Sequence, residues 1–194
     1  DPLKDIVKII EADNLETIGF DNQVSFAYYQ GLQAIFEGYT LSPQSNFMEE
    51  LRMIKDEKEL ATIRKACSIS DRAFTDVLDF IKPGQTTELQ VANFLDFRMR
   101  EYGASGISFE SIIASGYRSA MPHGVASEKV IQSGETLTMD FGCYYNHYVS
   151  DMTRTIHIGD TTDEEREIYD IVLRSNQALI DAAKAGMTRR DYDK

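Results

Sequence analysis

The sequence has few cysteines, few histidines and no tryptophan, and these shortages limit the kinds of site it can build. Only two of its 194 residues are cysteines, Cys67 and Cys143, and they lie far apart in the sequence. Two isolated cysteines form neither a disulfide framework nor a thiolate metal site, so we expect a reducing, cytoplasmic environment. Any site that uses histidine must draw on three residues, His123, His147 and His157.

Basic residues and long apolar segments are scarce as well. There are 20 Lys and Arg against 32 Asp and Glu, which gives a formal net charge of −12. This charge argues against a nucleic-acid partner, because phosphate contacts need clustered Lys and Arg. No run approaches the roughly 20 apolar residues of a membrane span, and no basic segment followed by an apolar segment opens the sequence. With 42% hydrophobic residues the chain can still build a core, so we expect a soluble globular protein. The first residue is Asp1 rather than Met, which suggests a start that is processed, trimmed or cut.

The first 46 residues read as part of an α/β domain. Apolar residues at helical spacing predict a helix over 2–12, with Asp1 as its N-cap. A strand is expected over 16–20, and a helix capped by Ser25 is expected to end near Phe36. This βα pattern is too small to stand alone. Turn-forming residues follow from residue 37, so we place a domain boundary after residue 46, with 47–194 as the second domain.

The rest of the chain predicts two helices, a group of strands and a last helix. The expected helices cover 55–81, 88–103 and 163–186, the second being capped by Thr87. The expected strands cover 108–115, 135–143 and 148–158. A further element is expected to start within 187–194. This order predicts an α+β fold with an antiparallel sheet.

Two aspartates in the predicted hairpin attract attention because aspartate is depleted inside strands. Alternation places Asp140 on the polar face of one strand and Asp151 on the polar face of the next. A two-residue turn at Tyr145-Asn146 would put Asp140 directly opposite Asp151. Like charges in directly opposed positions are unfavourable, and a hard divalent cation with oxygen ligands would remove the conflict. The residues alone leave open a metal site, a pair of solvated side chains at a hairpin end, and a catalytic acid dyad.

The three histidines differ in their setting. His123 lies in a loop, Met121-Pro122-His123-Gly124, and loops often carry function. A lone loop histidine is nevertheless usually just solvated, and its spacing matches no familiar metal-ligand motif. His147 is expected to be solvated in the hairpin turn. His157 falls on the aspartate face of its strand, where it could face the site.

At these residues the sequence resembles the Xaa-Pro peptidases, prolidase and aminopeptidase P, of the pita-bread metallopeptidases. The most specific matching segments are Met121-Pro122-His123-Gly124, Asp140-Phe141-Gly142 and Ser150-Asp151-Met152-Thr153-Arg154-Thr155. The matching segments extend in order from about Leu51 to Gly186. Residues 1–46 resemble the end of the creatinase-like N-terminal domain of that family. The resemblance implies the first half of a pita-bread fold, with an antiparallel sheet and covering helices, preceded by a βα remnant of an α/β domain.

The resemblance also implies the site and its chemistry. Asp140 and Asp151 would be two of five protein ligands of a binuclear Mn, Co or Zn site, and His123 would contact the substrate. The substrate would be a peptide with proline at its second position, cleaved before that proline, and the protein would be a homodimer. The family's other ligands, one histidine and two glutamates, match nothing in this chain. We therefore expect them beyond residue 194, and expect the isolated chain to be inactive.

Other interpretations remain on the same fold. A non-catalytic binding or scaffold protein could keep the fold without the full site. A metal-free creatinase-like hydrolase would not need two facing aspartates. Methionine aminopeptidase shares the metal site but is disfavoured by the preceding α/β segment and by the motifs around His123 and Thr153.

Overall fold

The computed structural model describes the backbone of residues 2–192 and the side chains of residues 5–192. It divides into two compact units, residues 1–56 and residues 57–194. The division falls ten residues after the boundary expected at residues 46 and 47. The proposed N-cap, Asp1, lies outside the described residues. Within them, no helix combines the length and the apolar character that a membrane span requires.

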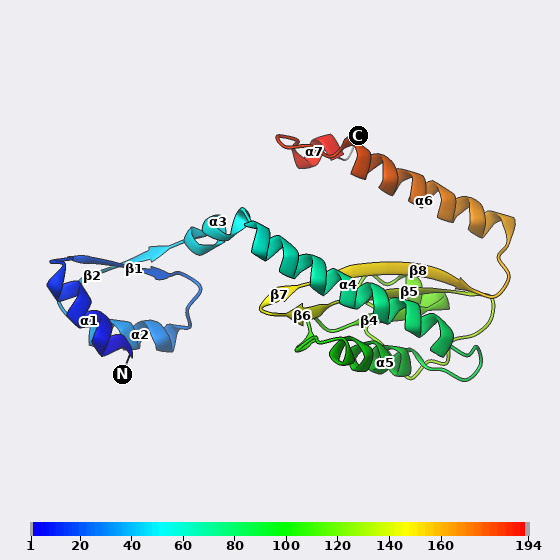
Figure 1. The fold of residues 1–194 in the computed structure, drawn as a ribbon, viewed down its shortest axis with the longest axis horizontal. Helices are drawn as coiled ribbons and strands as arrows, with labels where there is room; N and C mark the ends of the chain where they lie inside the picture. Colours follow the sequence, from blue (N-terminus) through cyan, green and yellow to red (C-terminus); the bar gives the residue numbers. More distant parts are fainter. Residues whose placement is uncertain (1, 193–194) are drawn as a thin grey trace. The chain divides into compact units, whose positions relative to one another are not determined.

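The first unit alternates helices with two strands (Figure 1). Its elements are α1 (Pro2–Ala12), β1 (Thr17–Asp21), α2 (Phe26–Ile35), β2 (Thr40–Gln44) and α3 (Phe47–Met53). Strands β1 and β2 pair in parallel, which requires the crossover through α2. The Ser25 hydroxyl accepts a hydrogen bond from the Tyr28 backbone N–H, which confirms the predicted cap. A small core of Ile10, Leu32 and Phe36 holds the unit together.

Strand β2 corrects the sequence-based interpretation of residues 37–46. The turn-forming residues of this stretch predict a linker, yet Thr40–Gln44 forms a strand. Pro43 lies opposite Phe20 in the two-stranded sheet. Proline lacks the N–H that a central strand would need, but an edge strand tolerates it. Both strands of a two-stranded sheet are edges, so the turn-rich composition did not prevent strand formation.

The second unit contains two long helices, two small antiparallel sheets and a C-terminal helical region (Figure 1). The helices are α4 (Glu57–Phe80), α5 (Glu88–Glu101), the 3₁₀ helix η1 (Gly116–Ala120), α6 (Asp163–Ala182) and α7 (Arg189–Tyr192). The strands are β3 (Gly106–Ile107), β4 (Ile112–Ser115), β5 (Glu135–Phe141), β6 (Cys143–Tyr145), β7 (Tyr148–Val149) and β8 (Met152–Ile158). One sheet has the order β4-β5-β8 and the other the order β3-β6-β7.

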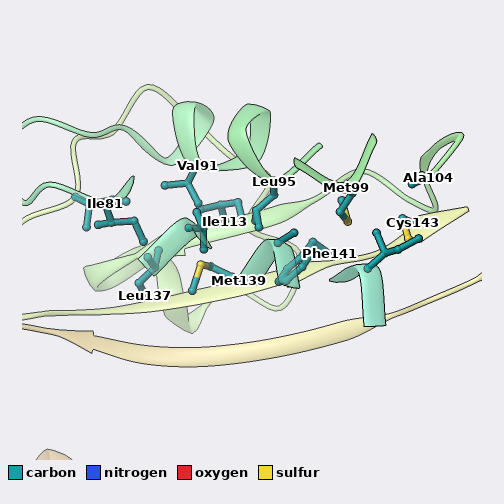
Figure 2. Close-up of a cluster of buried hydrophobic side chains, with 14 of the residues drawn as sticks. Ile81, Val91, Leu95, Met99, Ala104, Ile113, Leu137, Met139, Phe141 and Cys143 are labelled. Carbon is teal, nitrogen blue, oxygen red and sulfur yellow. The ribbon is translucent and has the colours of Figure 1, made fainter. Parts of the chain in front are cut away.

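The core lies on one face of the β4-β5-β8 sheet. Strand β5 alternates strictly, and its residues Leu137, Met139 and Phe141 are fully buried. They point toward the apolar side of α5, as Figure 2 shows. A capping box at Thr87 begins this helix, with reciprocal hydrogen bonds between Thr87 and Gln90. The opposite face of β5 carries polar side chains, and this is the face on which the candidate site residues lie.

Candidate metal centre

Asp140 lies on the polar face of β5, between two buried core residues of the same strand. Met139 and Phe141 fix the strand against the core, so the Asp140 side chain must project from the other face. Its carboxylate is half-buried, and Oδ1 accepts a hydrogen bond from the Thr153 hydroxyl at 2.8 Å. A rigid strand and one fixed oxygen therefore give this carboxylate a defined orientation.

Asp151 is exposed and follows a residue whose backbone and side chain are both held. The Ser150 N–H donates to the Cys143 carbonyl at 2.9 Å, and the Ser150 carbonyl accepts from the Ser108 hydroxyl at 2.9 Å. The Ser150 hydroxyl accepts from the Cys143 N–H at 3.0 Å and lies 2.7 Å from the Ser70 hydroxyl. Ser150 is only 3% exposed. The backbone that leads into Asp151 is thus pinned at the point where β7 gives way to β8.

The predicted register, with Asp140 directly opposite Asp151, is wrong. Asp140 pairs with Thr153, because the turn lies at Asn146-His147 instead of Tyr145-Asn146. Moving the turn by one residue shifts the pairing by two, and a shift of two keeps every side chain on its predicted face. Asp151, two residues before Thr153, therefore occupies the diagonal position next to Asp140. Diagonal neighbours of this kind lie about 7–8 Å apart, which separates the carboxylates and leaves room between them.

His123 lies in the exposed loop after η1, which runs beside β4, at the edge of the sheet opposite β8. Two residues later, Val125 bridges to Ile112 of β4, and Ile112 in turn pairs with Asp140. A row across the sheet thus runs from Val125 through Ile112 to Asp140 and then Thr153. Neighbouring strands lie about 4.8 Å apart, which places the His123 loop about 10 Å from the β5 position of Asp140. That spacing would let a small ligand lie between them.

The other two histidines are placed elsewhere. His147 is exposed in the hairpin turn, as expected. His157 pairs with Thr136 at the far end of β8, and its Nε2 atom lies 2.9 Å from the Asp160 carbonyl oxygen. Its Nδ1 atom lies 4.0 Å from Glu165 at the start of α6. It therefore shares the aspartate face but contacts the loop and helix that follow β8.

Glu165 has its own structural role. Hydrogen bonds from the Thr162 backbone N–H and hydroxyl, with a smaller contribution from His157, hold the pKa of Glu165 below its ordinary value. These contacts form a capping box at the start of α6. The Glu165 carboxylate at this helix start is thus used for capping.

The donor set indicates which group the site could hold. Asp140 and Asp151 supply carboxylate oxygens, which suit hard divalent cations. Within residues 2–192, no group of three or more His, Cys, Asp or Glu side chains could hold a metal ion. The two aspartates therefore fit part of a metal site. Divalent ions in protein sites need more ligands than this pair provides.

Comparison with known families identifies the chain. Residues 61–194 match the family model of metallopeptidase family M24, and residues 1–54 match that of the creatinase/prolidase N-terminal domain. The chain belongs to metallopeptidase family M24. The typical M24 site is binuclear, and Asp140 and Asp151 lie within the M24-matching segment.

Related proteins confirm the predicted α+β fold, the first half of a pita-bread fold with part of a creatinase-like domain before it. The M24 chain is 39% identical over 180 residues to a Xaa-Pro dipeptidase of Pyrococcus furiosus, covering 93% of this chain and 51% of that protein. A solved Xaa-Pro dipeptidase from Bacillus anthracis superposes with a TM-score of 0.91 at 41% identity, covering 98% of this chain and 54% of that one. An X-Pro aminopeptidase from Thermotoga maritima gives a TM-score of 0.91 at 36% identity, with coverages of 100% and 55%. The chain thus spans about half the length of the relatives it matches.

Proposed function

We propose that a full-length protein containing this chain is a metal-dependent peptidase that cleaves the bond preceding a proline at the second position of a peptide. In this proposal Asp140 and Asp151 are two of the ligands of two divalent ions, either Mn, Co or Zn. The remaining ligands come from residues outside this chain, and His123 contacts the substrate. The observation that carries the proposal is the diagonal placement of two partly or fully exposed carboxylates on one face of a rigid hairpin.

In this proposal Asp140, Asp151 and His123 have different roles. The Thr153 hydroxyl occupies Oδ1 of Asp140, which orients the carboxylate. The pinned Ser150 fixes the backbone from which Asp151 projects. Divalent ions supply Lewis-acid polarisation of the carbonyl and activation of water in such sites. His123, in the loop beside β4, would donate a hydrogen bond to the peptide carbonyl oxygen and stabilise the charge that develops on it.

The relatives' names support the substrate class. The curated relative from Pyrococcus furiosus and the solved protein from Bacillus anthracis are both named Xaa-Pro dipeptidases. The protein from Thermotoga maritima is named an X-Pro aminopeptidase. These names share a preference for proline at the second position and differ in the length of the substrate. The proposal is therefore specific for the bond and leaves the choice between dipeptide and longer peptide to the assay.

The test is an assay of the full-length protein on three peptide sets with added Mn²⁺, Co²⁺ or Zn²⁺. The sets are Xaa-Pro dipeptides, Xaa-Pro-Xaa tripeptides, and Met-Xaa-Xaa peptides without proline. We expect hydrolysis of one or both proline sets. Hydrolysis of the methionine set alone would replace the proposal with a methionine aminopeptidase. No hydrolysis of any set would favour a scaffold protein.

Metal binding provides a second measurement. Calorimetric titration of the full-length protein with Mn²⁺ should show tight binding that Asp140→Asn and Asp151→Asn each weaken by more than the roughly 100-fold typical of residues that only support ligands. Asp160→Asn is the matched control, because Asp160 is an exposed acid in the loop that follows β8. Unchanged Mn²⁺ affinity in Asp140→Asn would contradict the assignment of the ligands.

A further inference from the structure

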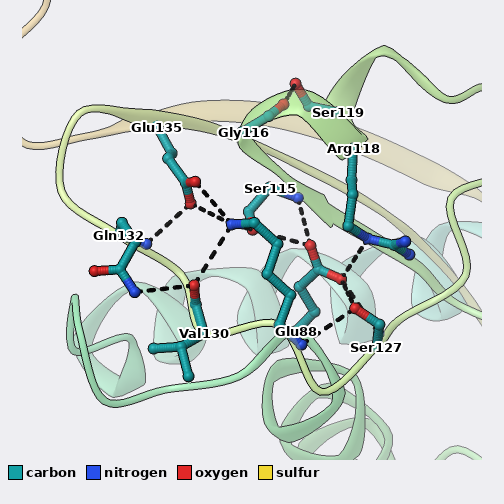
Figure 3. A network of polar contacts seen from close by, with 10 residues as sticks. Glu88, Ser115, Gly116, Arg118, Ser119, Ser127, Val130, Gln132 and Glu135 are labelled. Carbon is teal, nitrogen blue, oxygen red and sulfur yellow. Dashed lines mark hydrogen bonds and ion pairs between the residues drawn. The ribbon is translucent and has the colours of Figure 1, made fainter.

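Glu88 is a fully buried carboxylate in the first turn of α5, and the proposed reaction does not use it. Five donors point at its two oxygens (Figure 3). Oε1 accepts from the Ser115 N–H at 2.7 Å and from its hydroxyl at 2.9 Å. Oε2 accepts from the Ser127 N–H at 3.2 Å, from its hydroxyl at 2.6 Å, and from Arg118 Nε at 3.0 Å. Such a concentration of donors on one buried charge requires a reason.

The three donor residues flank the loop that carries His123. Ser115 ends β4 and Arg118 lies in η1, both before His123, while Ser127 follows it. The first turn of α5 also holds this segment through its backbone, because the Leu89 N–H donates to the Ser127 carbonyl at 2.9 Å. One carboxylate therefore ties together both ends of a thirteen-residue segment, 115–127, with His123 inside it.

Arg118 adds a direct connection to the His123 loop. Its Nε atom donates to Glu88, while its Nη2 atom donates to the Val125 carbonyl at 2.6 Å. Val125 is two residues from His123, and the Val125 N–H itself donates to the His123 carbonyl at 2.9 Å. A continuous chain of contacts thus runs from Glu88 through Arg118 and Val125 to the backbone of His123.

The burial of Glu88 makes this connection restrictive. An ionised carboxylate away from water is stable only while its donors stay in place. Any displacement of the loop that withdraws Arg118 or Ser127 leaves part of that charge uncompensated, at a cost larger than that of a broken surface hydrogen bond. The accessible positions of His123 are therefore limited by a charge that does not touch the site.

We propose that Glu88 is a positioning residue for His123 and acts through Arg118 and Ser127. The consequence for catalysis rests on the proposed function, because only there does His123 contact substrate. The effect on the position of the loop does not rest on it. Two separate measurements can therefore test the two parts.

The first measurement is amide hydrogen exchange on the 194-residue chain. Glu88→Gln removes the charge, and Arg118→Met removes the link to Val125 while Glu88 keeps its serine donors. Loss of a charge-assisted bond predicts that exchange at Gly124 and Val125 speeds up about tenfold or more in each variant. Amides of Leu137 and Met139 in the central strand should change less than about twofold, because local opening does not spread through the sheet.

Lys129→Met is the matched control for the exchange experiment. Lys129 belongs to the other half of the same polar network, where its Nζ atom donates to Glu135 at 2.7 Å and to the Ser115 hydroxyl at 2.8 Å. The hydrogen bonds that its side chain donates go to Ser115, Val130 and Glu135 and not to Arg118 or Val125, so Gly124 and Val125 should keep their protection. Unchanged exchange at Gly124 and Val125 in Arg118→Met would overturn the inference. An equal acceleration at Leu137 and Met139 would overturn it too, since that reports general destabilisation.

The second measurement is steady-state kinetics of the full-length protein on an Xaa-Pro dipeptide. Displacement of His123 by about 1 Å predicts that Arg118→Met lowers kcat about 10- to 100-fold with little change in KM. Arg118→Lys, which keeps a charge beside Glu88, should recover part of the lost kcat. A wild-type kcat in Arg118→Met would overturn the catalytic part of the inference. A wild-type protein that hydrolyses no proline peptide would instead refute the proposed function, while the exchange result would still stand.

Discussion

Gly142 illustrates how a single residue can be dictated by its surroundings. It lies where the chain leaves β5 and enters β6, and its carbonyl accepts from the Ser108 N–H at 3.0 Å. A Cβ at this position would overlap the Ser150 carbonyl and the Ser108 hydroxyl. The two backbone segments approach this closely because hydrogen bonds hold Ser150 beside Cys143. Glycine therefore allows the backbone contact that sets the position of Asp151.

Gly142→Ala should destabilise the second unit by about 1–3 kcal/mol, because the added methyl group must push Ser150 away. Urea denaturation and amide exchange at Cys143 and Ser150 would measure the effect. Gly31→Ala in α2 is the control, since a Cβ there meets nothing within 4 Å and helical alanine is favoured over glycine. If Gly142→Ala leaves the chain as stable as before, the Ser150 segment can move, and so would not fix Asp151.

Asp76 provides a pH-dependent link between the two long helices. Hydrogen bonds from the Tyr102 hydroxyl and the Arg98 guanidinium hold the pKa of Asp76 below its ordinary value. A carboxyl whose pKa is lowered by folding stabilises the protein above its unfolded-state pKa. That contribution is lost as the pH falls through the lower folded-state value. Asp76→Asn should therefore destabilise the chain at about pH 7 and have little effect at about pH 2.

Urea denaturation of the original chain and of Asp76→Asn at both pH values checks this sign. Asp79→Asn, on the same helix, is the control and should change the free energy of unfolding little at either pH. If Asp76→Asn lowers the free energy of unfolding equally at both pH values, the charge of Asp76 is not what links α4 and α5.

The candidate site residues differ in how visible they are in the sequence. Asp140 and Asp151 could be found because a charged residue in an alternating strand breaks the pattern of its neighbours. His123 stood out through its loop and its motif. Glu88 could not be found, because a glutamate in the first turn of a helix reads as a solvated partner of the helix dipole. Its burial depends on Ser115 and Ser127, which lie 27 and 39 residues away in sequence.

Among the elements, the hairpin shows what periodicity can and cannot determine. The faces of Asp140 and Asp151 were predicted correctly, because alternation is a local property of each strand. The register of the two strands was predicted wrongly, because it depends on which two residues form the turn. The structure uses Asn146 and His147, both with positive φ, at 46° and 70°. Such a turn normally carries glycine at its second position, and the histidine there obscured it.

His147→Gly should therefore stabilise the hairpin. The left-handed conformation costs an ordinary side chain about 1–2 kcal/mol, and part of this gain is offset by the greater freedom of glycine in the unfolded chain. We expect a net gain of roughly 0.5 kcal/mol in thermal or urea denaturation. His147→Ala is the control, since alanine keeps the unfavourable φ and should give no gain. A loss of stability in His147→Gly would indicate that the imidazole makes a stabilising contact that outweighs the strain.

At the scale of the whole molecule, the two units have separate cores. The larger core, under α4 and α5, is drawn entirely from residues of the second unit, and the smaller one entirely from the first. The sequence predicted the amphipathic helix over residues 2–12 and the long helix that ends at residue 81, and the structure shows which of their residues enter each core. The division between the units lies ten residues beyond the expected boundary, and part of the turn-rich stretch 37–46 forms β2 within the first unit.

These separate cores lead us to expect separate unfolding. Only three apolar side chains are fully packed in the described part of the first unit, and a domain this small buries a limited share of its surface. Leu32→Ala should cost the first unit about 2–5 kcal/mol and speed up exchange at Ile18, without altering exchange at Met139. Leu95→Ala, the matched variant in the larger core, should speed up exchange at Met139 without altering exchange at Ile18. If either variant accelerates exchange equally at both positions, the chain unfolds as one cooperative unit, and the small core then draws its stability from the large one.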